Sequence, residues 1–291
     1  MGEVHMLVSP HGGRGRAAAA APVVRRVIEQ AGHTPVDISG DSAEASAEAA
    51  RAVVATGAER LIAVGGDGTL HLAVQGVAGS GTALGLVPAG TGNDFARAVG
   101  LFGLSPEEAA AAALGPTRPV DAIRTDRARW VILSMTGGFS VDVNVRADRM
   151  SFPKGPSRYT VATLLTMPGL RHRELVVTVD GQRSELRSAL FAVNNASTFG
   201  GGMAICPDAD IADGLIDVCA VGPASRTTML RLLPKVFEGG HVGHRHVHMM
   251  QGRSVTIEGE PMDLVGDGEP IGATPITLEV VPGAVNFAAG G

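Results

Sequence analysis

The sequence predicts an α/β protein with a mostly parallel, helix-covered sheet in a first domain and a β-sandwich in a second. The chain has 291 residues, whereas one domain usually holds roughly 100 to 200. Up to about residue 120, short apolar runs alternate with helical patterns. Beyond Asp121, strand-like runs follow one another between turns. We therefore expect domains at residues 1–121 and 122–291.

The first domain is predicted as a succession of strand–helix units. The expected strands are residues 4–9, 34–38, 60–64 and 83–87. The expected helices are residues 16–31, 43–56, 70–78 and 94–99. Ser105, Pro106 and Glu108 form a capping box that begins another helix, which ends at Gly115. Such alternation implies a parallel sheet covered on both faces.

The second domain begins after a connection marked by Gly115, Pro116 and Pro119. Its expected strands are residues 130–135, 174–179, 186–193, 215–221, 254–258 and 276–281. Two helical patterns interrupt them, at residues 159–167 and 227–237. Many short strands separated by turns favour a sandwich.

Composition excludes several classes of protein. With 45% hydrophobic residues, the chain can offset its conformational entropy, which excludes disorder. A net charge of −5 predicts no nucleic-acid partner. Cys206 and Cys219 are too few for a disulfide scaffold and are expected in the core. The N-terminus lacks signal-peptide features, and glycines interrupt the uncharged stretch 68–93, so we expect a cytoplasmic protein without a membrane span.

The sharpest local motif is the turn Gly65-Gly66-Asp67-Gly68-Thr69, between a predicted strand and a predicted helix. Glycines let backbone N–H groups approach an anion, and a helix N-terminus adds further donors, although such turns also occur without a ligand. Asp67 favours phosphoryl chemistry, because a carboxylate beside phosphate is unfavourable unless it binds magnesium, a hydroxyl or a proton. The turn PAGTGNDFAR at 88–97 follows the next strand, so both can face one ligand.

These two turns resemble the catalytic domain of the diacylglycerol kinase and sphingosine kinase superfamily, in its bacterial lipid kinase branch. Further motifs follow in the family's order: SPHGGRG at 9–15, GGFSVD at 137–142, GGGM with DGLIDV within 200–218, and GDGEP with EVVPGA within 266–284. Several motifs in the same order over nearly the whole chain are much more specific than a single motif, so a chance resemblance is improbable. The first loop departs from the family pattern, since Ser9 replaces asparagine and Gly12 replaces serine.

The resemblance implies a nucleotide domain with the fold of NAD kinases and phosphofructokinases, and a β-sandwich that receives lipid. It implies an ATP- and Mg²⁺-dependent kinase that phosphorylates a lipid hydroxyl, with diacylglycerol as the leading substrate. The nucleotide-binding positions carried over are Ser9, Pro10, His11, Gly12, Gly13, Ser39, Gly65, Gly66, Asp67, Gly68, Thr69, Leu70, His71 and Thr91.

The resemblance also places the general base at Glu269, with Asp267 beside it, although Asp267-Gly268 alone would indicate an ordinary turn. Their spacing would put both carboxylates on one side of an extended segment. A lipid hydroxyl needs a positioned acceptor for its proton. Asp67 is the alternative base, and the sequence does not separate the two roles. A second, structural magnesium is implied at Asp210, Asp213 and the carbonyl of Leu215.

The expected partners are a diacylglycerol-like lipid and, transiently, the inner face of the membrane. Basic residues flank the apolar helical pattern near 159–167, namely Arg158 before it and 171–173 after it. A homodimer is left open. Two alternatives remain, an NAD-kinase-like or other small-alcohol kinase and a nonenzymatic lipid- or nucleotide-binding regulator. A metal site among the histidines of 241–248 is disfavoured, because no Cys or acid lies among them.

Overall fold

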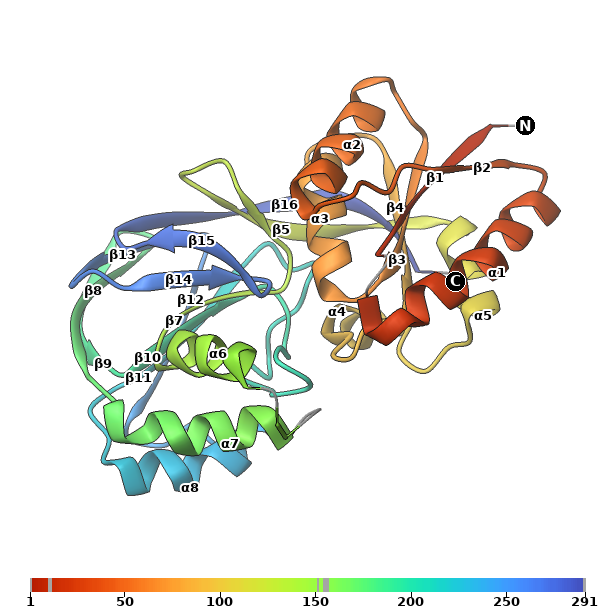
Figure 1. Cartoon of the computed structure of the whole chain (residues 1–291). Helices are drawn as coiled ribbons and strands as arrows, with labels where there is room; N and C mark the ends of the chain where they lie inside the picture. Colours follow the sequence, from red (N-terminus) through yellow and green to blue (C-terminus); the bar gives the residue numbers. More distant parts are fainter. Residues whose placement is uncertain (1, 10–11, 151, 154–156, 290–291) are drawn as a thin grey trace.

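The computed structural model describes residues 2–9, 12–150, 152–153 and 157–289 (Figure 1). In the first domain the parallel strands stand in the order β2–β1–β3–β4. Their bounds are β1 (Glu3–Val8), β2 (Thr34–Asp37), β3 (Arg60–Gly65) and β4 (Ala83–Pro88). The helices are α1 (Arg16–Gln30), α2 (Ala43–Ala55), α3 (Asp67–Val77), α4 (Asp94–Ala98) and α5 (Pro106–Leu114), with a 3₁₀ turn η1 (Gly12–Gly15) before α1. The predicted α/β class is confirmed.

Helices cover both faces of this sheet because the strands present apolar side chains on both faces. Ile62 and Val64 pack with α1 and α5. Leu61 and Ala63 pack with α2 and α3. Successive side chains of a strand point to opposite faces, so both faces of β3 are buried. The predicted capping box of α5 is present, with reciprocal hydrogen bonds between Ser105 and Glu108.

The second domain is a sandwich of two antiparallel layers. One layer has the order β12–β11–β10–β7–β14–β15. Its strands are β7 (Ser134–Gly138), β10 (Leu190–Asn194), β11 (Ile216–Val221), β12 (Val247–Gly252), β14 (Asp263–Gly266) and β15 (Glu269–Ala273). The other layer contains β8 (Arg173–Val179), β9 (Gln182–Ser188) and β13 (Ser254–Gly259). Phe191 and Val218 of the first layer pack against Val177 and Ile257 of the second.

Helices α6 (Phe139–Arg149), α7 (Ser157–Thr166) and α8 (Arg226–Val236) lie together at the outer side of the sandwich (Figure 1). A 3₁₀ turn, η2 (Met167–Gly169), follows α7. No helix among the described residues has both the length and the apolar character that a bilayer crossing requires. Helix α6 was not predicted, because Gly137 and Gly138 dominate the pattern at its start.

One long strand, β16 (Ile276–Ala288), joins the two domains. Its first residues pair with β13, and Asn286–Ala288 pair in parallel with β4. Strand β5 (Thr117–Thr125) pairs with β16 along both halves, and β6 (Trp130–Val131) pairs with β5. The sequence predicted only a connection before residue 121, because Pro116 and Pro119 usually interrupt strands. The chain therefore crosses between the domains twice within one continuous sheet.

Two predicted strands are divided in the structure. Residues 130–135 form the separate strands β6 and β7. Residues 186–193 are split between β9 and β10, which belong to different layers of the sandwich. Both segments are mostly apolar, although the first contains Ser134 and the second contains Arg187 and Ser188. A mostly apolar run does not by itself show where a chain changes sheets.

Asp121 holds the crossing point. Its buried carboxylate accepts hydrogen bonds of 2.7 Å from the N–H groups of Gly214 and Gly283. Gly283 lies at the irregularity of β16 between Val281 and Val285, where the strand passes from one domain to the other. Asp121 thus attaches this bend and a loop of the second domain to β5.

We expect Asp121→Ala to lower the free energy of unfolding by about 3 to 5 kcal/mol, since each hydrogen bond to a charged group contributes about 1.5 to 3 kcal/mol. Equilibrium urea unfolding measures the change. Asp126→Ala is the matched control, because the exposed Asp126 accepts one longer bond, 3.2 Å from Thr277 N–H. Equal losses in the two variants would contradict the role assigned to Asp121.

Candidate active site

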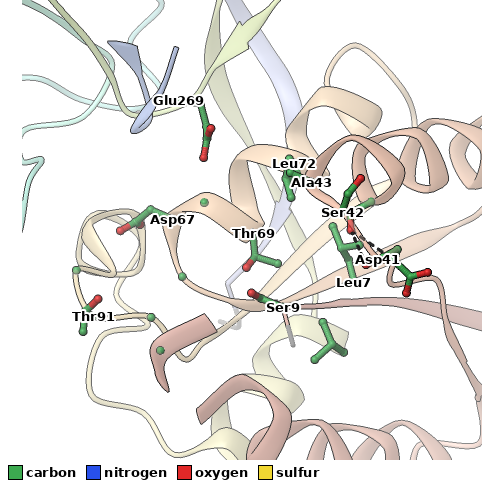
Figure 2. Close-up of a pocket in the computed structure, with 18 residues that line it drawn as sticks. Leu7, Ser9, Asp41, Ser42, Ala43, Asp67, Thr69, Leu72, Thr91 and Glu269 are labelled. Atoms are coloured by element: carbon green, nitrogen blue, oxygen red, sulfur yellow. Dashed lines mark hydrogen bonds between the residues drawn. The ribbon is translucent and has the colours of Figure 1, made fainter. Parts of the chain in front are cut away.

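A cleft of about 490 Å³ opens at the carboxyl ends of the parallel strands, where Glu269 of the second domain faces the first (Figure 2). Parallel α/β sheets bind their ligands at this edge. The residues that line the cleft are Leu7, Val8, Ser9, Gly13, Gly40, Asp41, Ser42, Ala43, Ser46, Gly66, Asp67, Gly68, Thr69, Leu72, Gly90, Thr91, Gly92 and Glu269. Gly66 and Glu269 therefore share one cleft, as the predicted chemistry requires.

Two glycines of the cleft, Gly66 and Gly90, lie so close together that neither leaves room for a Cβ. A Cβ on Gly66 would lie 2.8 Å from the Cα of Gly90, and a Cβ on Gly90 would lie 2.4 Å from the Cα of Gly66. The two turns are thus in backbone contact. Gly66 is the N-cap of α3, so the unpaired N–H groups of this helix begin at the cleft. Such an end attracts anions.

Arg16 holds these turns together from the side of α1. Its guanidinium donates to the carbonyl of Gly13 at 3.0 Å and to the carbonyl of Gly90. A Cβ on Gly13, at φ +59°, would overlap the carbonyl of Ala89. The first loop and the PAGTGN turn are therefore joined by backbone contact and one arginine, which the sequence interpretation did not single out.

Asp67 has two structural partners as well as a place in the cleft. Its carboxylate accepts from the N–H groups of Asp94, at 3.1 Å, and Phe95, at 3.2 Å, at the start of α4. Burial raises the pKa of the Asp67 carboxyl; these N–H groups oppose the rise, and the charges of Asp94 and Asp267 add to it. Asp67 is thus an acid whose ionised form is disfavoured by its surroundings.

Asp94 connects the domains at the side of the cleft. Its buried carboxylate accepts bonds of 2.7 Å from the N–H groups of Gly201 and Gly202. These glycines have φ of +88° and +96°, a region that favours glycine. The GGGM motif therefore offers two adjacent amides to an acid of the first domain.

Asp267 and Glu269 lie in different surroundings. The segment is not extended as expected, because Asp267 and Gly268 have φ of +51° and +93° and form the tight turn between β14 and β15. The fully buried Asp267 side chain accepts from the N–H groups of residues 132–134 at 2.9 to 3.1 Å. Its Oδ2 also lies 3.1 Å from Nδ1 of His71. Glu269 is exposed and points into the cleft (Figure 2).

Of the predicted nucleotide-binding residues, the structure brings together in the cleft Ser9, Gly13, Gly66, Asp67, Gly68, Thr69 and Thr91. Gly12 begins η1, and Gly65 ends β3. Leu70 is buried in the core and His71 contacts Asp267. The Ser39 hydroxyl accepts from Val8 N–H at 2.8 Å, which ties β1 to the end of β2. Pro10 and His11 lie outside the described residues.

The segment from Gly40 to Ser46 was missed; it comprises the loop after β2 and the first turn of α2. Ser42 caps α2 by accepting from Ala45 N–H at 3.1 Å, and Asp41 and Ser46 also line the cleft. This loop follows β2, so it reaches the same sheet edge as the glycine turns. The end of the predicted strand 34–38 was therefore the signal in the sequence that could have identified these residues as part of the site.

The predicted structural magnesium residues lie on an exposed loop before β11. Asp210 accepts from Ala212 N–H at 3.0 Å, and Asp213 accepts from Leu215 N–H at 2.9 Å. Within the described part of the chain, no three His, Cys, Asp or Glu side chains are grouped so that they could hold a metal ion. The magnesium assignment stays a prediction.

Each of the two domains matches a protein-family model, and both matches agree with the family resemblance found in the sequence motifs. Residues 3–125 match the family of the diacylglycerol kinase catalytic domain. Residues 134–289 match the YegS C-terminal NAD kinase beta sandwich-like domain. In fold, the chain is similar to a crystal structure of a diacylglycerol kinase from Bacillus anthracis str. Sterne, with a TM-score of 0.74 and 18% identity over 98% of this chain and 96% of that one.

Two relatives extend the similarity along nearly the whole sequence. The diacylglycerol kinase of Mycobacterium tuberculosis (strain ATCC 25618 / H37Rv) is 34% identical over 98% of this chain and 94% of its own length. That of Bacillus subtilis (strain 168) is 27% identical over 94% of this chain and 92% of its own length. The chain therefore belongs to the diacylglycerol kinase family and is a lipid kinase.

Proposed function

We propose that the protein transfers the γ-phosphate of Mg²⁺-bound ATP to the hydroxyl of diacylglycerol, forming phosphatidic acid. The observation that carries this proposal is the cleft shared by the amide-lined turns of the first domain and by Glu269 of the second. The names of the relatives support the choice of lipid. The base would thus reach an acceptor hydroxyl beside the phosphate to be transferred.

The phosphates would bind where the glycine turns and the start of α3 meet. Backbone N–H groups there can approach the oxygens because Gly66, Gly68, Gly90 and Gly92 carry no side chain. Thr69 and Thr91 also line this part of the cleft and add hydroxyl groups. Amides alone leave most of the triphosphate charge uncompensated.

Magnesium fits the donor set of the cleft. Among its described lining residues none is cationic, whereas Asp41, Asp67 and Glu269 are acidic. Carboxylates and water are the ligands that Mg²⁺ prefers, and Asp67 is the acid at the glycine turn, so it would hold the ion. When bound, Mg²⁺ neutralises the β- and γ-phosphates. We keep Asp210, Asp213 and the Leu215 carbonyl as the proposed structural site.

Glu269 is the group that would accept the proton of the attacking hydroxyl. Its exposed carboxylate faces the cleft, whereas both oxygens of Asp267 already accept hydrogen bonds. Asp267 therefore positions the base: it attaches the turn before Glu269 to residues 132–134 and to α3 through His71. The base and the phosphate-binding helix are held together by this one carboxylate.

Helix α7 and its neighbours would meet the membrane that contains the lipid. Leu164 and Leu165 are 51% and 52% exposed, and Phe152 is 81% exposed. Arg158 in the first turn of α7, and Arg171 and Arg173 after the helix, supply positive charge near its two ends. Apolar side chains flanked by cations suit contact with an anionic bilayer surface. We therefore propose that the protein contacts the inner face of the membrane transiently.

A transfer assay tests the substrate. The protein is incubated with Mg²⁺ and ATP labelled in the γ-phosphate, and with diacylglycerol, a sphingoid base, a polyprenol or NAD. We expect label in diacylglycerol because the relatives bear that name. Label in NAD alone would favour the dinucleotide alternative, and a folded protein that labels none would contradict the proposal.

We expect Glu269→Gln to lower kcat by about 10² to 10⁴, the usual contribution of a positioned acid or base. The KM for ATP should change little, because the glycine turns remain. Glu258→Gln is the control, since Glu258 is exposed in a similar Glu-Gly-Glu-Pro segment outside the cleft. Full activity of Glu269→Gln, measured in the same assay, would transfer the role of base to Asp67.

The raised pKa of Asp67 predicts a dependence of stability on pH. A group whose folded pKa is raised contributes stability that is fully present below its unfolded pKa and is lost as pH rises through the folded pKa. The stability of the wild type relative to Asp67→Asn should therefore fall as pH rises from about 4, the ordinary aspartate value. Urea unfolding of both proteins across this range measures the difference. If the wild type instead became more stable relative to Asp67→Asn as pH rises, the raised pKa of Asp67 would be contradicted.

A further inference from the structure

A second hollow, of about 250 Å³, lies on the outer side of the sandwich between α8 and the turn that follows it. Thr228, Arg231, Leu232 and Lys235 line it from α8, and His244 and Arg245 line it from the turn. The α8 positions are three, four and seven residues apart, so they share one face of the helix. The lining is therefore strongly basic and separate from the catalytic cleft.

The positive charges of this hollow are not compensated within the protein. Among the described residues, no carboxylate lies within 4.0 Å of Arg231, Lys235 or Arg245. Arg231 and Lys235 are four residues apart on α8, where like charges repel. Such a cluster is unfavourable for the isolated protein, and an anion would relieve it.

The histidines of the turn add a donor. His246 N–H donates to Nδ1 of His244 at 3.4 Å, so the proton of the His244 ring is on Nε2. Arg245 Nε donates to Nε2 of His246 at 3.3 Å. The ring centroids of His244 and His246 lie 5.4 Å apart. Desolvation lowers the pKa of His246, and the nearby charges of Arg245, His244 and His248 lower it further.

We propose that this hollow binds a phosphate group. Guanidinium groups match the geometry of phosphate oxygens, and an ammonium and an imidazole N–H supply further donors. Arg231, Lys235, Arg245 and His244 offer these groups around one cavity that none of the described acids lines. The phosphate could be a phospholipid head group or a small soluble phosphomonoester.

The surroundings of the hollow favour the lipid head group. Leu230, Phe237 and Val242 are exposed on α8 and just after it. Helix α8 also adjoins α7, because Met229 shares a core cluster with Ala162, and Arg226 donates to the Pro168 carbonyl at 2.6 Å. Exposed apolar groups around a phosphate site suit a protein that lies on an anionic bilayer.

Vesicle flotation and calorimetry test the site with Arg231→Gln/Arg245→Gln. One arm uses phosphatidylcholine vesicles with and without phosphatidylglycerol, and the other titrates glycerol 3-phosphate. We expect the double variant to bind the anionic vesicles at least about tenfold more weakly than the wild type, since each basic residue near a membrane contributes about 1 kcal/mol. Arg51→Gln/Arg118→Gln, which removes two exposed arginines of the first domain, should retain more of this binding.

Loss of the glycerol 3-phosphate signal in the double variant, with unchanged vesicle binding, would identify a soluble phosphomonoester as the ligand. Arg231→Lys/Arg245→Lys keeps the charge and should keep most of the binding, which separates loss of the site from loss of folding. The proposal is overturned if Arg231→Gln/Arg245→Gln binds both the anionic vesicles and glycerol 3-phosphate as strongly as Arg51→Gln/Arg118→Gln does. Neither arm measures phosphoryl transfer, so failure here is distinct from failure of the proposed kinase reaction.

Discussion

The hydrogen bonds of Asp267 are the interaction on which the active site depends. One buried carboxylate binds the N–H groups of residues 132–134 and the ring of His71. His71 lies on α3, the helix whose N-terminus faces the cleft. Glu269 comes two residues after Asp267, so the contact between Asp267 and His71, which crosses between the domains, places the proposed base relative to the phosphate site. A buried carboxylate with these partners cannot be removed without leaving several N–H groups unpaired.

The same device recurs at the other junctions of the domains. Asp94 accepts from Gly201 and Gly202, and Asp121 accepts from Gly214 and Gly283. In these two cases the carboxylate binds backbone N–H groups of glycines, which carry no side chain. Together with the shared strand β16, these bonds make the two domains mechanically continuous around the cleft.

The cleft and the hollow beside α8 differ in how they would receive phosphate. The cleft has amides, hydroxyls and acids, so in the proposed reaction a divalent cation would balance the charge of the triphosphate. The hollow has arginine, lysine and histidine side chains and needs no metal. The proposed catalytic site and the proposed attachment site thus differ in what would supply the positive charge that phosphate requires.

Residue patterns alone predicted the α/β domain, the sandwich and the membership of the glycine turns in one site, because periodicity and glycine placement are local properties. The glycine turn placed Asp67 in the site, and the resemblance to the family, carried by the order of the motifs, placed Glu269 there. Only the tertiary structure showed that Asp267 and Glu269 have different surroundings. Asp267 and Gly268 have positive φ values, which the sequence did not reveal. The partners of Asp267, residues 132–134 and His71, are distant from it in sequence. The tertiary structure alone revealed the contacts of Arg16, the place of residues 40–46 in the cleft and the passage of β16 through both domains, because each depends on which strand ends and backbones meet in space.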